Sequence, residues 1–131
     1  MKTAGLETVR DYFDTSDVGI VLIGMPGFER RLARYPQLYS RVGFAHQYRP
    51  LDSTDIPHVL ARYWQELGLS YDPHRTADAE SVVTIVRITG GNFRLIERLM
   101  SQVARIMTIN HLDTITPDAI EAAREVLVVG T

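Results

Sequence analysis

A Gly-Gly-Asn sequence at residues 90–92, followed by a long apolar stripe, constrains this chain more than any other feature. Glycine is favoured just past the end of a helix, and asparagine is favoured at the N-cap, where its side-chain oxygen accepts a hydrogen bond from a first-turn amide. We therefore predict that one helix ends at the glycines and that another begins at Asn92 and runs to about residue 109. Apolar residues recur at helical spacing along one face of this second helix: Ile96, Leu99, Met100, Val103, Ile106 and Met107.

Arg94 does not fit this pattern. It would occupy the second position of the helix, where the helix dipole disfavours a positive charge by roughly 0.3–1 kcal/mol. An arginine is favourable at this position if its guanidinium and the free amides of the first turn bind the same anion. The alternatives are that Arg94 points into solvent or pairs with a nearby carboxylate, and the local sequence leaves all three open.

The 131 residues carry a formal net charge of −2, and none of them is cysteine. A chain of this length predicts one compact domain, or one domain with a small appendage. The lack of cysteine excludes disulfides and thiolate metal sites, and the four scattered histidines have no metal-ligand spacing, so we expect no metal site. No apolar run approaches the roughly 20 residues of a membrane span, so we expect a cytoplasmic protein with no membrane partner.

Two segments in the first part of the chain have strand patterns. Residues 18–24 form a continuous apolar run, which is typical of a strand covered on both faces. In residues 42–48, Phe44, His46 and Tyr48 alternate with smaller residues, which also favours a strand. Because parallel strands need neighbours and crossover helices, one or two strands predict a remnant of a larger α/β core.

Two short helices accompany these strands, at residues 2–14 and 28–35. The second carries Arg30, Arg31 and Arg34. These arginines could contact DNA phosphates, or they could simply form a solvated helix face.

The pattern from residue 52 onward is helical throughout. We predict four helices, at about residues 52–67, 76–89, 92–109 and 116–127, with Gly68 and Thr116 as stop and start signals. The expected buried face of the second of these helices consists of Ala79, Val82, Val83 and Val86, with Ile85 as a further candidate. The predicted fold class is therefore mostly α: a truncated α/β core remnant with one or two strands at residues 1–51, then a four-helix bundle at residues 52–131.

Three motifs in this order resemble the C-terminal portion of an AAA+ ATPase. They are GIVLIGMPG at residues 19–27, YPQLYSRVGF at residues 35–44, and GGNFRLI at residues 90–96. The chain looks like the helper ATPases of bacterial DNA transposition, of the TniB, IstB and phage Mu B kind, and secretion ATPases of the ExeA kind share the layout. The resemblance covers nearly the whole chain and implies that residues 1–51 end the AAA+ core and that residues 52–131 form its helical lid.

The resemblance also implies roles for individual residues. Arg41 would be the arginine finger, which acts in trans on the γ-phosphate bound by a neighbouring subunit. Arg94, together with Asn92 and Gly91, would form the sensor 2 phosphate site of the lid. ATP and Mg²⁺ would be the cofactors of the complete parent protein.

The sequence departs from the AAA+ pattern at two points, and both limit the activity that we expect of this chain. The position of sensor 1 falls on Met25 or Gly24, neither of which can orient a water, so sensor 1 is not assigned. The chain has no G-x-x-x-x-G-K-[ST] phosphate loop and no apolar run ending in Asp-Glu. We therefore expect this chain alone to bind no cofactor and hydrolyse no ATP, and to be a fragment or the product of a gene that lost its N-terminal half.

The motifs and their departures from the AAA+ pattern leave two hypotheses for the function. The favoured hypothesis is the C-terminal part of a transposition helper that binds ATP, oligomerises on DNA, and recruits or stimulates a transposase. The alternative is a non-catalytic helical adaptor that binds a partner protein or DNA. Because the sheet neighbours are missing, we also expect either self-association through about the first 50 residues or pairing of the two strands in an arrangement unlike that of the family.

Overall fold

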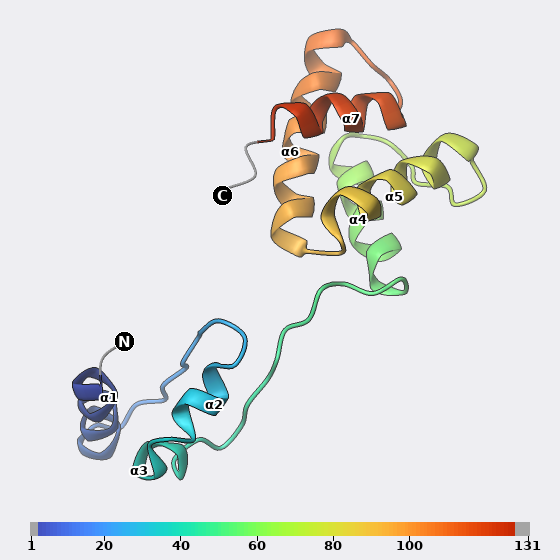
Figure 1. Ribbon diagram of the computed structural model, residues 1–131. Coiled ribbons are helices and arrows are strands. Elements are labelled where there is room, and N and C mark those ends of the chain that lie inside the picture. The colour runs from blue at the N-terminus through green and yellow to red at the C-terminus, as the bar shows by residue number, and fades with distance from the viewer. Residues whose placement is uncertain (1–2, 128–131) are drawn as a thin grey trace. The chain divides into compact units, whose positions relative to one another are not determined.

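The computed structural model describes residues 3–127, which contain seven helices and no strand (Figure 1). The prediction of a mostly helical fold is confirmed. The chain divides into two compact units, Met1–Tyr48 and Arg49–Thr131, and each unit is described by itself below. None of the helices within residues 3–127 combines the length and the apolar character needed to cross a membrane.

The first unit contains α1 (Thr3–Thr15), α2 (Phe28–Leu32) and α3 (Pro36–Tyr39). Pro36 occupies the first turn of α3, where the lack of an amide hydrogen costs nothing. The core of this unit is small: one leucine from each helix is buried, and a few partly buried side chains pack against them. The buried leucines are Leu6, Leu32 and Leu38.

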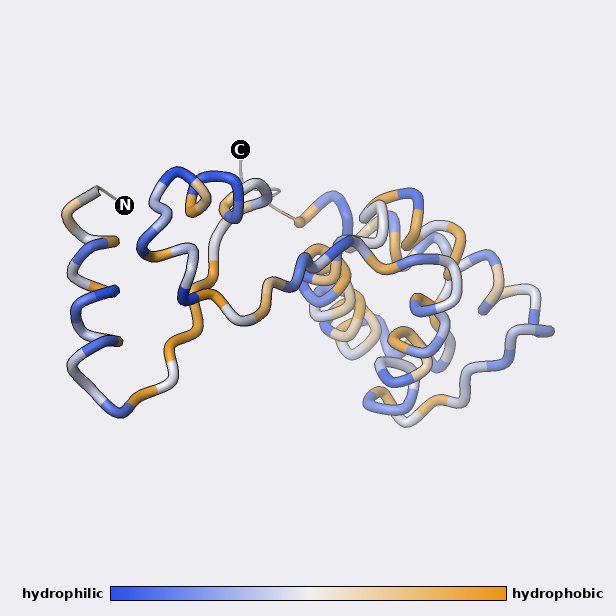
Figure 2. The backbone as a smooth tube through the Cα atoms, turned by 90° about the horizontal axis from the view of Figure 1, so that it is seen from below, coloured by the Kyte–Doolittle hydropathy of each residue, from blue (hydrophilic) through white to orange (hydrophobic). Residues whose placement is uncertain are grey.

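The one or two strands expected in this unit are not formed. Residues 18–24 and 42–48 have no regular secondary structure. A strand is held by hydrogen bonds to a neighbouring strand, and neither segment pairs as a strand with the other or with any other described segment. The alternative that the two strands pair in an arrangement unlike that of the family is therefore wrong. The apolar side chains of the first segment are divided: Leu22 packs against the buried leucines, whereas Val21 and Ile23 are 84% and 91% exposed. Figure 2 shows orange stretches between α1 and α2.

The second unit is a bundle of four helices. They are α4 (Asp55–Glu66), α5 (Thr76–Thr89), α6 (Phe93–Asn110) and α7 (Pro117–Glu125), and α7 packs against both α5 and α6 (Figure 1). The apolar stripe predicted for α6 is buried, apart from the partly buried Ile106. Trp64 of α4 is fully buried in the same core and meets the ring of Tyr71 edge-on at a centroid distance of 5.7 Å.

The buried face of α5 differs from the predicted one. Val83 is 67% exposed, whereas Asp78, Ser81 and Thr89 are buried on the same face as Ile85. These polar groups are buried without a large penalty because each finds a hydrogen-bond partner. The hydroxyl of Ser81, for example, donates to the carbonyl of Ile115 at 3.3 Å.

The carboxylate of Asp78 is the most completely buried charged group of the described residues. It accepts hydrogen bonds from Nε1 of Trp64 at 3.0 Å and from the amide of Asp72 at 2.9 Å. Nη1 of Arg75 lies 3.3 Å from its Oδ2 atom. Asp78 therefore joins α5 to α4 and to the loop between them.

Candidate functional site

The first turn of α6 presents a free cation. Arg94 is exposed, and its guanidinium has no hydrogen bond or ion pair with any described residue. Asn92 caps the helix as predicted, since its Oδ1 atom accepts from the amide of Leu95 at 3.1 Å. The amides of Phe93 and Arg94 find no acceptor within residues 3–127. A guanidinium and two open amides at a helix N-terminus can together bind an anion.

Gly91 has a different role from the one expected of a phosphate-site glycine. Its amide donates to Oγ1 of Thr89 at 3.3 Å, and its carbonyl accepts from the amide of Leu51 at 2.8 Å. Its φ of +77° lies in the left-handed region, and a Cβ atom would lie 2.3 Å from the carbonyl oxygen of Leu51. Gly91 thus allows the backbone before α4 to contact the turn before α6, and it supplies no open amide.

A mostly apolar groove of about 320 Å³ lies beside this turn. Its walls come from the chain entering α4, from α5, and from the two glycines. The lining residues are Leu51, Ser53, Ile56, Pro57, Val82, Val86, Gly90 and Gly91. The last two directly precede the cap and the first turn that carries Arg94.

Arg41 belongs to the first unit and is held by three hydrogen bonds. Its Nε atom donates to Oδ1 of Asp14 at 2.6 Å, and its Nη2 atom donates to Oδ2 of the same carboxylate at 2.7 Å. Its Nη1 atom donates to the carbonyl of Gln37. About a third of each charged side chain is exposed, 35% for Arg41 and 37% for Asp14.

Asp14 was not singled out from the sequence. The hydrogen bond from Arg41 holds the pKa of this carboxyl below its ordinary value of 3.8, with the positive charges of Arg41 and Arg10 adding to the effect. The pair is 27 residues apart, so no local spacing reveals it. One signal was available: Asp14 lies in the last turn of α1, where the helix dipole disfavours a negative charge unless a cation is near.

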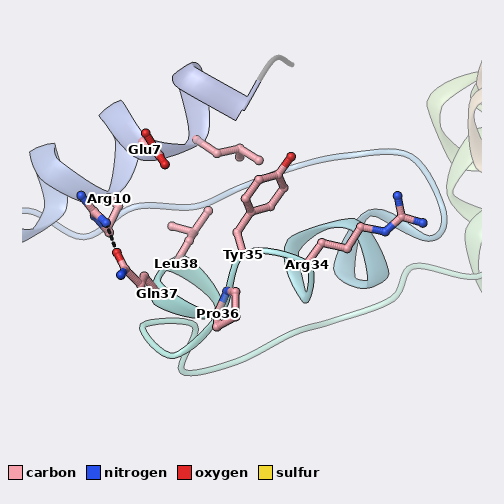
Figure 3. A pocket seen from close by; sticks show the side chains of 8 residues that line it. Glu7, Arg10, Arg34, Tyr35, Pro36, Gln37 and Leu38 are labelled. Atoms are coloured by element: carbon pink, nitrogen blue, oxygen red, sulfur yellow. Dashed lines mark hydrogen bonds between the residues drawn. The ribbon is translucent and has the colours of Figure 1, made fainter.

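The arginines considered for DNA binding lie in or just after α2. Arg30, Arg31 and Arg34 are all exposed. Figure 3 shows a pocket between α1 and the residues around α3, with Leu38 and the Tyr35 ring facing α1 and the Arg34 side chain pointing away from it. Arg10 donates to Oε1 of Gln37 across this pocket. Of the three arginines, only Arg34 lines this pocket, so the pocket does not bring them together in one site.

No three His, Asp or Glu side chains within residues 3–127 lie close enough to hold a metal ion. At the unassigned sensor 1 position, Met25 is 82% exposed and its carbonyl accepts from the amide of Phe28. A Cβ atom on Gly24 would collide with the Phe28 ring. Neither residue places a polar side chain there.

The chain is similar to a curated Staphylococcus aureus protein named "Potential ATP-binding protein". The two are 46% identical over 130 residues, which is 99% of this chain and 48% of the relative. The chain therefore spans about half the length of the curated relative it matches. No family model matches the chain, and no solved structure matches it significantly.

Proposed function

We propose that this chain forms the sensor and lid portion of an ATP-binding protein of the AAA+ kind. In this proposal Arg94 contacts the phosphates of ATP, and the apolar groove beside Gly90 and Gly91 accommodates the base. The Mg²⁺ ion and the phosphate loop belong to the part of the protein that corresponds to the rest of the S. aureus relative.

The observation that carries the proposal is the free guanidinium of Arg94. An exposed cation at a helix N-terminus is unfavourable without an anion, and no described carboxylate compensates it. The name of the relative supports ATP as the source of that anion, because the match covers 99% of this chain.

We further propose that Arg41 acts in trans as an arginine finger on ATP bound by a neighbouring subunit. This requires self-association, for which the exposed apolar side chains of Val21, Ile23 and Met25 offer a surface. The resemblance to transposition helpers supports DNA and a transposase as cytoplasmic partners, with Arg30, Arg31 and Arg34 as candidate DNA contacts.

The proposal can be tested in a hybrid protein, in which this chain replaces the matching residues of the S. aureus relative. Arg94→Ala should weaken ATP binding about 10- to 100-fold, because one charge-assisted hydrogen-bonding group is lost. Arg105→Ala is the matched control, since Arg105 is exposed on the same helix and has no described partner. Titration with a fluorescent ATP analogue measures both affinities.

Equal ATP affinity in the Arg94→Ala and unmodified hybrids would remove the phosphate-binding role. ATP binding by neither the hybrid nor the relative would favour the helical adaptor instead. Circular dichroism should show an intact helical bundle in both variants, because Arg94 lies outside the core.

A further inference from the structure

We propose that Asp14 is a positioning residue for Arg41: the carboxylate at the end of α1 fixes the guanidinium in the orientation that it presents to the neighbouring subunit's nucleotide. This inference rests on the proposed function, and it adds a residue that neither the sequence motifs nor the relative's name assigns.

The hydrogen bonds between Asp14 and Arg41 hold the guanidinium in a fixed orientation. Two parallel hydrogen bonds, at 2.6 and 2.7 Å, join the Nε and Nη2 atoms of Arg41 to the two carboxylate oxygens of Asp14. Such a fork sets the plane of the guanidinium as well as its position. The third hydrogen bond, from Nη1 to the carbonyl of Gln37, removes the remaining rotation.

The guanidinium of Arg41 is fixed, but not all of its N–H groups are engaged in hydrogen bonds. Its three hydrogen bonds occupy three of the five N–H groups that an arginine carries, so two remain open. A third of the side chain is exposed to solvent. Arg41 can therefore donate to a phosphate oxygen without leaving Asp14.

This arrangement matters for catalysis because Arg41 comes from a segment without regular structure. It follows α3, a helix of only 4 residues, and precedes residues 42–50, which have no helix or strand. A long arginine side chain on such a segment would otherwise sample many rotamers, and ordering it at the transition state would cost entropy. Asp14, at the end of a 13-residue helix, holds the Arg41 side chain in one conformation before the reaction begins, so this entropy is not lost at the transition state.

The alternative is that Asp14 only ties α1 to α3. The two roles differ in what they change. A purely structural tie would affect stability and ATP binding through the fold, whereas a positioning residue lowers kcat through Arg41 alone. The hydrogen bond from Arg41 lowers the pKa of Asp14, which favours the charged carboxylate that either role requires.

The test uses the hybrid protein and measures ATP hydrolysis. Asp14→Asn should lower kcat about 10- to 100-fold, the usual cost of a small misplacement of a reacting group, while KM for ATP changes less than about twofold. In the Arg41→Ala background, Asp14→Asn should cause no further loss. Asp11→Asn is the matched control, because Asp11 lies on the same helix and pairs with Arg10 instead.

A second measurement does not depend on ATP. In the 131-residue chain, NMR can follow exchange of the Arg41 Nε–H proton with water, and Asp14→Asn should accelerate it whereas Asp11→Asn should not. Unchanged exchange in Asp14→Asn would overturn the positioning role. So would an unchanged kcat in Asp14→Asn when Arg41→Ala abolishes hydrolysis. An unchanged kcat in Arg41→Ala would instead overturn the proposed finger itself, and the inference with it.

Discussion

The amide of Leu51 donates a 2.8 Å hydrogen bond to the carbonyl of Gly91, and the carbonyl of Leu51 faces the Cα atom of Gly91 so closely that a Cβ would lie 2.3 Å away. This backbone contact fastens the segment before α4 to the turn before α6. It therefore fixes the start of the helix that carries Arg94.

Gly91→Ala should destabilise the second unit because the new methyl group meets a backbone oxygen that cannot rotate away. Gly90→Ala is the matched control: Gly90 also has a positive φ, of +57°, but open space around its Cα atom. Both variants lose roughly 1–2 kcal/mol from left-handed strain, and Gly91→Ala should lose about 1–3 kcal/mol more. Urea unfolding of the two variants measures the difference, and equal stabilities would contradict the close contact.

Asp78→Ala should lower the free energy of unfolding by about 2–4 kcal/mol, because the buried Nε1–H of Trp64 and the partly buried amide of Asp72 lose their acceptor. Glu80→Ala, on the exposed face of the same helix, should change it by less than about 0.5 kcal/mol. Trp64 is the sole tryptophan, so its fluorescence reports unfolding of this unit directly. A loss below about 1 kcal/mol for Asp78→Ala would show that these donors find other partners.

The ion pair of Asp14 and Arg41 should make the stability of the first unit depend on pH. The pKa of Asp14 in the folded chain lies below its ordinary value of 3.8, chiefly because Arg41 donates a hydrogen bond to it. A lowered pKa means that the stabilisation is fully present above about pH 4–5 and is lost as the pH falls through the folded-state pKa. An NMR titration of the Asp14 carboxyl carbon should give a midpoint below 3.8 that rises in Arg41→Gln. The same midpoint in both proteins would rule out the pair.

The exposed apolar residues of the first unit should drive self-association. Val21, Ile23 and Met25 are each more than 80% exposed, and burying such side chains is favourable by roughly 25 cal/mol per Å². Sedimentation velocity should show species above the 14.8 kDa monomer, shifted toward the monomer by a double Val21→Ser, Ile23→Ser change. Val83→Ser, at an exposed valine of α5 in the second unit, should not shift them. A chain that is monomeric at every concentration would contradict this prediction.

The parts of the fold that could be predicted from the sequence are those specified locally. Asn92 and Thr116 cap their helices as expected, because a cap needs only a side-chain oxygen and an amide three residues later. The stripe of α6 was predictable for the same reason. The residues that form these features are neighbours along the chain.

The parts that could not be predicted depend on contacts between distant residues. The valines of α5 predicted a buried face that differs from the observed one. Asp78 and Ser81 are buried instead, because each has a hydrogen-bond partner far along the chain: Trp64 for Asp78 and Ile115 for Ser81. Residues 18–24 and 42–48 had side chains suited to strands, but a strand also needs hydrogen bonds to a neighbour, and these two segments do not pair as strands with each other or with any other described segment. At the candidate site, the resemblance pointed to Arg41, whereas the sequence carried only an indirect signal for Asp14, an acid in the last turn of a helix. Its pairing with Arg41, 27 residues away, is seen only in the folded chain.

ATP hydrolysis by mixed assemblies tests most directly whether this chain completes a nucleotide site shared between subunits. One hybrid carries Arg41→Ala, and the other is disabled in the phosphate loop that we place in the remaining half of the protein. Each alone should be inactive. Their mixture should recover activity, because some interfaces then pair an intact phosphate loop with an intact Arg41. If no mixing ratio restores hydrolysis in assemblies confirmed by sedimentation, Arg41 does not act in trans.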